Sequence, residues 1–274
     1  MATSAEPGDA QPTRPDDPDL TADLEVVGRV AQSSNRALLC RLAGTGHHVI
    51  YKPIRGERPL WDFPDGTLAG REVAAHLVSR LGGWDLVPPT ILREGPLGPG
   101  SVQLWIGDPF DPVDDETVVS VVPAGRVPAG WLEVFDGETT TGQQVAVVHV
   151  DLPEVRSLAV LDAVLNNSDR KGSHCLRDDT GRLWAIDHGV CFHTEPKLRT
   201  VLWGWAGEPI PDGDLQRLAR LEDALHLEAL ATALGILLPA DDVLALGRRT
   251  RGLLRSRRHP QPSGGWPSVP WPPL

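Results

Sequence analysis

Residues 165–189, "LNNSDRKGSHCLRDDTGRLWAIDHG", decide how the chain is interpreted. The strand-like pieces "SHCLRD" and "RLWAID" flank the turn sequence "DDTG", which predicts a short hairpin. Asp169, Lys171 and His174 stand at its start, and Asp187 ends it. The stretch is either a polar loop between two strands or part of a catalytic site. The rest of the sequence must distinguish these two interpretations.

The segments around this stretch predict an order of elements. Before it, "LPEVRSLAVLDAVLNN" (152–167) has helical apolar spacing, and after it residues 214–239 and 240–258 are helical in pattern. In the first half, residues 24–53 predict three strands of a meander, and residues 66–83 predict a helix that stops at Gly82 and Gly83. Two further strands are expected in "PPTILREG" (88–95) and "GSVQLWIG" (100–107).

These elements predict an α+β fold in two lobes, a small β-rich N-terminal lobe and a larger, mostly helical C-terminal lobe. The boundary is placed near "GDPFDPVDD" (107–115). The expected organisation is a disordered N-terminal tail, the two lobes and a Pro/Trp-rich tail that is also disordered, at 1–21, 22–107, 108–258 and 259–274.

Composition excludes several classes of function. A net charge of −11 and a pI near 5.2 argue against a nucleic-acid partner. The basic cluster "RRTRGLLRSRRH" (248–259) could form a surface that binds a polyanion or the periphery of a membrane. We favour the alternative, that it is a solvated helix face. No transmembrane segment or signal peptide is expected, and three cysteines without a C-x-x-C pair favour a reducing cytoplasm. The strong preference for Arg over Lys, with abundant Ala, Gly and Pro, indicates a GC-rich and therefore bacterial genome.

Several residues have the types and order that phosphoryl transfer from ATP requires. Lys52 ends a predicted strand, where a lysine can hold phosphates, and Glu72 lies on the next helix, where it can orient that lysine. The turn between the first two strands offers backbone N–H groups and hydroxyls to cover phosphates, at Ser33, Ser34 and Asn35.

The quoted stretch supplies the remaining parts. Asp169 would receive the proton of the acceptor hydroxyl, and Lys171 can reach the transferred phosphoryl group. His174 stands where kinases usually place a metal-binding Asn. Asp187, in "D-H-G", corresponds to the metal-binding Asp of the kinase Asp-Phe-Gly motif.

The spacing D-R-x-x-x-[N/H], a hairpin and "IDxG" resembles phosphatidylinositol 3-/4-kinases, especially the type II 4-kinase branch, and nearest of all a bacterial phosphatidylinositol-kinase-like family. "REVAAHLVSRLGGWDLVPPT" and "LAVLDAVLNNSDRKGSH…AIDHG" carry the resemblance, over roughly residues 25–210. It implies a protein-kinase-like fold and ATP-dependent phosphorylation, with phosphate, pairing, catalytic and Mg²⁺-binding roles for Lys52, Glu72, Asp169 and Asp187. The strand "VQLWI" would contact adenine, through Gln103, Leu104 and Trp105.

The chain departs from this family at two points. His174 replaces the Asn, and because Mg²⁺ prefers oxygen ligands, either Mg²⁺ or Mn²⁺ is expected. The segment after Asp187 is short and has one Lys and one Arg, so the unknown acceptor is expected to be a protein or small molecule rather than a lipid.

Three alternatives remain open. The chain is a nucleotide-binding pseudokinase, or it transfers an adenylyl group on the same scaffold. The third is a structural zinc site with candidate ligands His174, Cys175, His188, Cys191 and His193. We favour it less because the spacing of these residues fits no standard zinc pattern.

Overall fold

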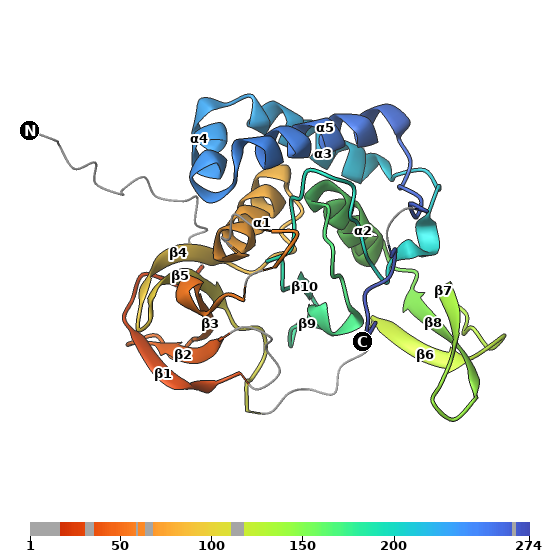
Figure 1. Ribbon diagram of the computed structural model, residues 1–274, viewed down its shortest axis with the longest axis horizontal. Coiled ribbons are helices and arrows are strands. Elements are labelled where there is room, and N and C mark those ends of the chain that lie inside the picture. The colour runs from red at the N-terminus through yellow and green to blue at the C-terminus, as the bar shows by residue number, and fades with distance from the viewer. Residues whose placement is uncertain (1–16, 31–35, 59, 64–67, 111–117, 265–266) are drawn as a thin grey trace, which may run out of the picture.

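The computed structural model describes residues 17–30, 36–58, 60–63, 68–110, 118–264 and 267–274. It has an α+β fold, as the sequence predicts (Figure 1). The strands are β1 Leu24–Arg29, β2 Leu38–Leu42, β3 His48–Pro53, β4 Thr90–Gly95, β5 Gly98–Leu104, β6 Val119–Pro123, β7 Trp131–Glu138, β8 Gln144–Val150, β9 Cys175–Arg177 and β10 Leu183–Ala185. The helices are α1 Leu68–Gly82, α2 Pro153–Leu165, α3 Asp212–Leu225, α4 Glu228–Leu237 and α5 Ala240–Ser256, with short 3₁₀ turns η1 Ile54–Gly56, η2 Gly172–His174 and η3 Trp203–Trp205.

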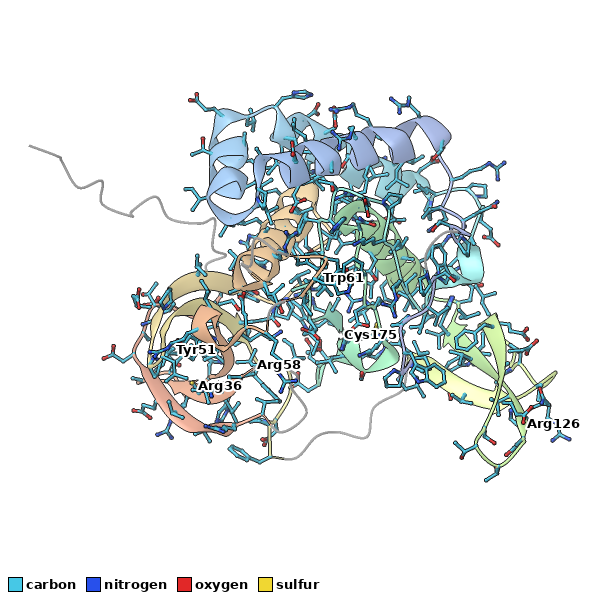
Figure 2. The ribbon with its side chains drawn as sticks, viewed as in Figure 1. Arg36, Tyr51, Arg58, Trp61, Arg126 and Cys175 are labelled. Carbon is cyan, nitrogen blue, oxygen red and sulfur yellow. The ribbon has the colours of Figure 1, made fainter. Side chains whose placement is uncertain are left out.

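The five strands predicted in the first half form one antiparallel sheet in the order β1-β2-β3-β5-β4. Side chains alternate across β3, so Val49 and Tyr51 enter a small apolar core while Lys52 points to the opposite face. Tyr51 lies among the strands in Figure 2. This alternation places the lysine beside the following helix.

Helix α1 joins the sheet to the helical part of the chain. It contacts β4 and β5 on one side and α3 and α4 on the other, and nearly all its side chains are buried. Its apolar residues belong to the larger core formed with α2 to α5. Inside that core the Arg71 guanidinium donates to Asp242 at 2.7 Å, which ties α1 to α5.

The sheet β6-β8-β7 occupies the right-hand end of the molecule in Figure 1 and was not predicted from the sequence. The expectation of a mostly helical part from residue 108 onward is therefore wrong for its first third. Residues 144–150, "QVAVVHV", are rich in β-branched side chains, which favour strands. The imidazole of His149 packs on the indole of Trp205, with ring centroids 4.4 Å apart. This contact fixes the sheet to η3.

The last helices follow the sequence closely, with one difference. The expected helix at 214–239 is two helices, because the α-helical hydrogen bonding breaks at His226 and Leu227. The predicted helix at 240–258 is α5. Across the part of the chain that the structure describes, no helix combines the length and apolarity needed to cross a membrane.

The expectation that residues 259–274 are disordered is wrong for their described part. His259 is buried, and its N–H donates to the carbonyl of Glu208. The carbonyl of Ser268 accepts from the N–H of Thr200. Proline-rich composition suggested disorder, but the proline carbonyls still accept hydrogen bonds, and Pro270 is buried.

Candidate functional site

Lys52 is the centre of the candidate site. Its ammonium donates to the carboxylate of Glu72 on α1 and, at 2.9 Å, to Oδ1 of Asp187 after β10. Burial alone would lower the pKa of Lys52, but Asp187 and Glu72 raise it well above its usual value. The lysine therefore stays charged, and three residues far apart in the sequence meet as predicted.

Asp187 has an unusual backbone conformation. Its φ is +60°, in the left-handed region that Asp tolerates better than most residues. The positive charge of Lys52 holds the pKa of Asp187 well below its usual range. Its side chain remains 49% exposed. The result is an ionised and accessible carboxylate held in a strained position, a combination common at functional sites.

His174, at the end of η2, lies beside Asp187. Its Nδ1 is 3.0 Å from the carbonyl oxygen of Asp169, which can only accept, so Nδ1 carries the proton. Burial lowers the pKa of His174 to about 4, so the ring is neutral at pH 7. Its Nε2 lone pair then faces Oδ2 of Asp187 at 3.4 Å. Two acceptors this close favour a shared cation, so the pair fits a divalent metal ion.

Asp169 and Lys171 lie on the same loop and contact each other. The Lys171 ammonium is 3.2 Å from Oδ2 of Asp169. Burial raises the pKa of Asp169, and Lys171 opposes that rise. The backbone N–H of Asp169 donates to the side-chain oxygen of Asn167. The carboxylate is thus a somewhat stronger base than a free aspartate, and its position is fixed by the loop.

Arg170, for which the sequence predicted no role, organises this loop from inside. Its side chain is fully buried and donates twice to Asp162 on α2, at 2.9 and 3.0 Å. It also donates to the carbonyls of His174 and Ile186. One guanidinium thus ties α2 to both ends of the hairpin. The sequence signal was an arginine directly after Asp169 with an acid on the preceding helix.

His188 connects this network to Glu72. Arg170 donates to its Nε2 at 2.8 Å, and its own backbone N–H donates to Oε2 of Glu72 at 2.9 Å. Burial lowers the pKa of His188 well below its usual value. Among the described residues its Nδ1–H has no hydrogen-bond partner. The residues on either side of Asp187 are therefore held by buried hydrogen bonds, while Asp187 itself stays accessible.

The predicted adenine-contacting strand is β5 and the residues after it. The Gln103 amide donates to the Thr90 hydroxyl at 2.8 Å and is buried. The backbone N–H groups of Leu104 and Trp105 donate to the carbonyls of Pro89 and His48. Both N–H groups already donate to backbone carbonyls of this chain and are not available as donors to a purine. Adenine contacts therefore remain a prediction only for the other backbone and side-chain groups of Gln103, Leu104 and Trp105.

Two further sequence predictions concern phosphate and zinc. The turn residues Ser33, Ser34 and Asn35 lie outside the described residues. Cys175, at the start of β9 (Figure 2), and Cys191 are both buried. In the described ranges no group of three or more His, Cys, Asp or Glu side chains is arranged to hold a metal ion.

The basic cluster at 248–259 is largely engaged within the chain. Arg249 donates to the carbonyls of Val164 and His193, so it is part of the interior. Arg251 and Arg257 pair with carboxylates on α3. These contacts favour the helix-face interpretation over a polyanion patch.

The amino-acid sequence was compared with protein-family models and with known proteins. No protein-family model matches the chain. Fold and site together define an α+β protein whose sheet lysine is paired with a helix glutamate and a hairpin aspartate. The chain is 47% identical, over 274 residues, to "Protein Rv2133c" of Mycobacterium tuberculosis, with 97% of this chain and 98% of that protein covered. The chain belongs to the same family as Protein Rv2133c.

Proposed function

We propose that the protein is an ATP-dependent phosphotransferase of the phosphatidylinositol 3-/4-kinase-like type, with a two-lobed kinase-like fold. The observation that carries the proposal is the double ion pair of Lys52 with Glu72 and Asp187. A strand lysine oriented by a helix glutamate, beside an accessible aspartate, is the arrangement that phosphoryl transfer from ATP uses.

The roles follow from the contacts. Lys52 would bind the nucleotide phosphates, with Glu72 fixing its ammonium. Asp187 and His174 would hold Mg²⁺ or Mn²⁺, supported by the neutral Nε2 that faces the carboxylate. A divalent ion at this pair would neutralise charge on the phosphates. Because a nitrogen ligand suits Mn²⁺ better than Mg²⁺, we expect Mn²⁺ to support higher activity.

Asp169 is the proposed general base. The oxygen of the acceptor hydroxyl attacks the γ-phosphorus, and the bond to the β–γ bridging oxygen breaks. The hydroxyl proton moves to the Asp169 carboxylate, which burial has made more basic. Lys171, 3.2 Å from that carboxylate, is placed to stabilise the transferred group. ADP and a phosphorylated acceptor are the products.

A protein or small-molecule acceptor is favoured over a lipid. Lipid kinases need exposed basic groups to bind an anionic head group. In the segment 188–211, which follows Asp187, the one lysine is Lys197, which is buried and paired with Asp62, and the one arginine is Arg199, which is half-buried. These side chains do not form an exposed basic surface.

Parallel incubations with γ-labelled and α-labelled ATP test the proposal. Purified protein is mixed with bacterial lysate and Mn²⁺ or Mg²⁺, and label is followed in protein and small-molecule fractions. Transfer of the γ-label alone is expected, and Asp169→Asn should abolish it. Transfer of the α-label would mean adenylyl transfer. ATP binding without transfer of either label would mean a pseudokinase.

A further inference from the structure

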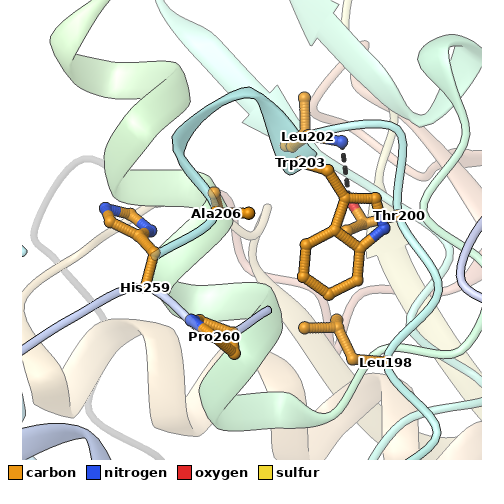
Figure 3. A pocket seen from close by; sticks show the side chains of 8 residues that line it. Leu198, Thr200, Leu202, Trp203, Ala206, His259 and Pro260 are labelled. Carbon is orange, nitrogen blue, oxygen red and sulfur yellow. Dashed lines mark hydrogen bonds between the residues drawn. The ribbon is translucent and has the colours of Figure 1, made fainter. Parts of the chain in front are cut away.

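The strongest feature outside the proposed chemistry is the path of the chain after α5. It runs back along residues 198–210 toward the loop of Asp169. Residues 258 and 259 pair with the backbone at 207–209. Figure 3 shows His259 and Pro260 across a small cavity from Trp203 and Leu198. The final residues continue in the same direction.

Residues 268–274, which we call the strap, are fixed at two places. The carbonyl of Ser268 accepts from the backbone of Thr200 at 3.0 Å and from the indole N–H of Trp203 at 2.7 Å. Further on, the carbonyl of Pro273 accepts from the backbone N–H of Gly172 at 2.9 Å. The strap therefore bonds directly to the loop that carries Asp169 and Lys171.

The fit at Gly172 is close. A Cβ at this position would lie 2.9 Å from Cδ2 of Leu274 and 2.9 Å from Cβ of Val119. Real Cβ atoms do not approach so closely, so only glycine fits between the strap and β6. The same loop is also paired on its other side. There the backbone N–H of Arg170 donates to the carbonyl of Arg199, and the carbonyl of Arg170 accepts from the backbone N–H of Val201.

We propose that the strap is a positioning element that holds the Asp169–Lys171 loop in its reactive conformation. This inference rests on the proposed function. Three backbone segments are joined by hydrogen bonds: the loop, residues 199–203 and the strap. Because a displacement of about 1 Å at a reacting group can lower a rate about a hundredfold, loss of the strap should slow turnover without weakening nucleotide binding.

The test compares the full chain with a variant ending at Pro267. Amide hydrogen exchange at Gly172, Arg170 and His174 reports the loop, and Mn²⁺-dependent ATP hydrolysis, with water as acceptor, reports turnover. In the shortened chain we expect loss of protection at the three amides, a tenfold or greater fall in kcat, and an unchanged KM for ATP. Cooperative urea unfolding of both chains controls for global misfolding.

Two point variants separate docking from the removal of residues. Trp203→Phe deletes the indole N–H that binds Ser268, so it should reduce Gly172 protection and kcat in the same direction but less strongly. Trp271→Ala changes a strap side chain that is 79% exposed, and neither quantity should move. A Trp271 effect as large as that of Trp203 would contradict docking through Ser268.

The outcomes are distinct. Unchanged exchange at Gly172, Arg170 and His174 in the shortened chain overturns the positioning role, whether or not the full chain is active. Lost protection with an unchanged or higher kcat also overturns it, and a higher kcat would indicate an inhibitory segment. A full chain that turns over no ATP refutes the proposed function instead, and the exchange data then decide whether the strap holds the loop.

Discussion

Replacement of Lys52 by methionine removes the cation between Glu72 and Asp187 and keeps most of the side-chain volume. The proposed contact from this ammonium to phosphate is a charge-assisted hydrogen bond, which contributes about 1.5–3 kcal/mol. Its loss should raise the dissociation constant for ATP by about 10- to 150-fold. The variant also leaves two carboxylates near the phosphates, which adds repulsion in the same direction.

The fold should survive this substitution. Glu72 is buried, but its Oε2 still accepts from the backbone N–H of His188. Asp187 is half exposed and can be solvated. We therefore expect a lower free energy of unfolding with a cooperative transition, so that weaker binding can be measured on folded protein.

Isothermal titration with ATP and Mn²⁺ measures the effect. The matched control is Arg41→Met, which removes another cation of the same sheet, one that donates to Glu25 at 2.6 Å on the surface. Exposed pairs contribute about 0–1 kcal/mol, and Arg41 lies far from the proposed phosphates in the strand pairing. Equal dissociation constants for wild type and Lys52→Met would refute the phosphate-binding role.

Four further perturbations test separate parts of the site and fold. Asp169→Ala should lower turnover by about a hundredfold or more with ATP affinity nearly unchanged by calorimetry; a large loss of affinity would contradict its role as base. His174→Asn should move the metal preference from Mn²⁺ toward Mg²⁺ in the turnover assay, and the same preference in His174→Ala would argue against ligation. Arg170→Met strands the buried carboxylate of Asp162, so urea unfolding should show a loss of about 3–5 kcal/mol; a change below about 1 kcal/mol would contradict the buried network. Burial lowers the pKa of His259 to about 4, and an unfolded histidine titrates near 6.5, so the unfolded state binds more protons between these values and stability falls as pH drops from about 6.5 to about 4. From pH 7 to pH 5 this residue should account for roughly 2 kcal/mol of that fall, and His259→Gln should retain less of it; identical pH profiles would disprove the assignment.

The three elements that meet at the candidate site could be predicted because each has a clear local signal in the sequence. A strand that ends in Lys52, a helix that contains Glu72 and a hairpin that ends in Asp187 each had a clear periodic or turn signal. Strand alternation then limits which face Lys52 can occupy. The meeting of Lys52, Glu72 and Asp187 depends on packing between distant segments, and it was expected from the set of groups that phosphoryl transfer requires.

Two parts of the fold, the sheet β6-β8-β7 and the strap, could not be predicted from local sequence signals. In the sheet β6-β8-β7, short apolar runs have no helical period and no strict alternation, as in "QQVAVVHV", and so gave no decisive signal. The ordered strap could not be predicted for a different reason. Its proline-rich composition is typical of disorder, whereas its attachment uses backbone carbonyls, which every residue has and which no sequence pattern marks.

His174, the proposed metal ligand, shows what the structure adds to the identity of a residue. From sequence, a histidine in place of an asparagine weakens the case for a metal site. In the structure the Asp169 carbonyl fixes the proton on Nδ1, and burial keeps the ring neutral, so the Nε2 lone pair is directed at Asp187. An asparagine there would offer an oxygen ligand but no such fixed tautomer. On the proposed function, a histidine at this position is compatible with metal binding and would change mainly which metal the site prefers.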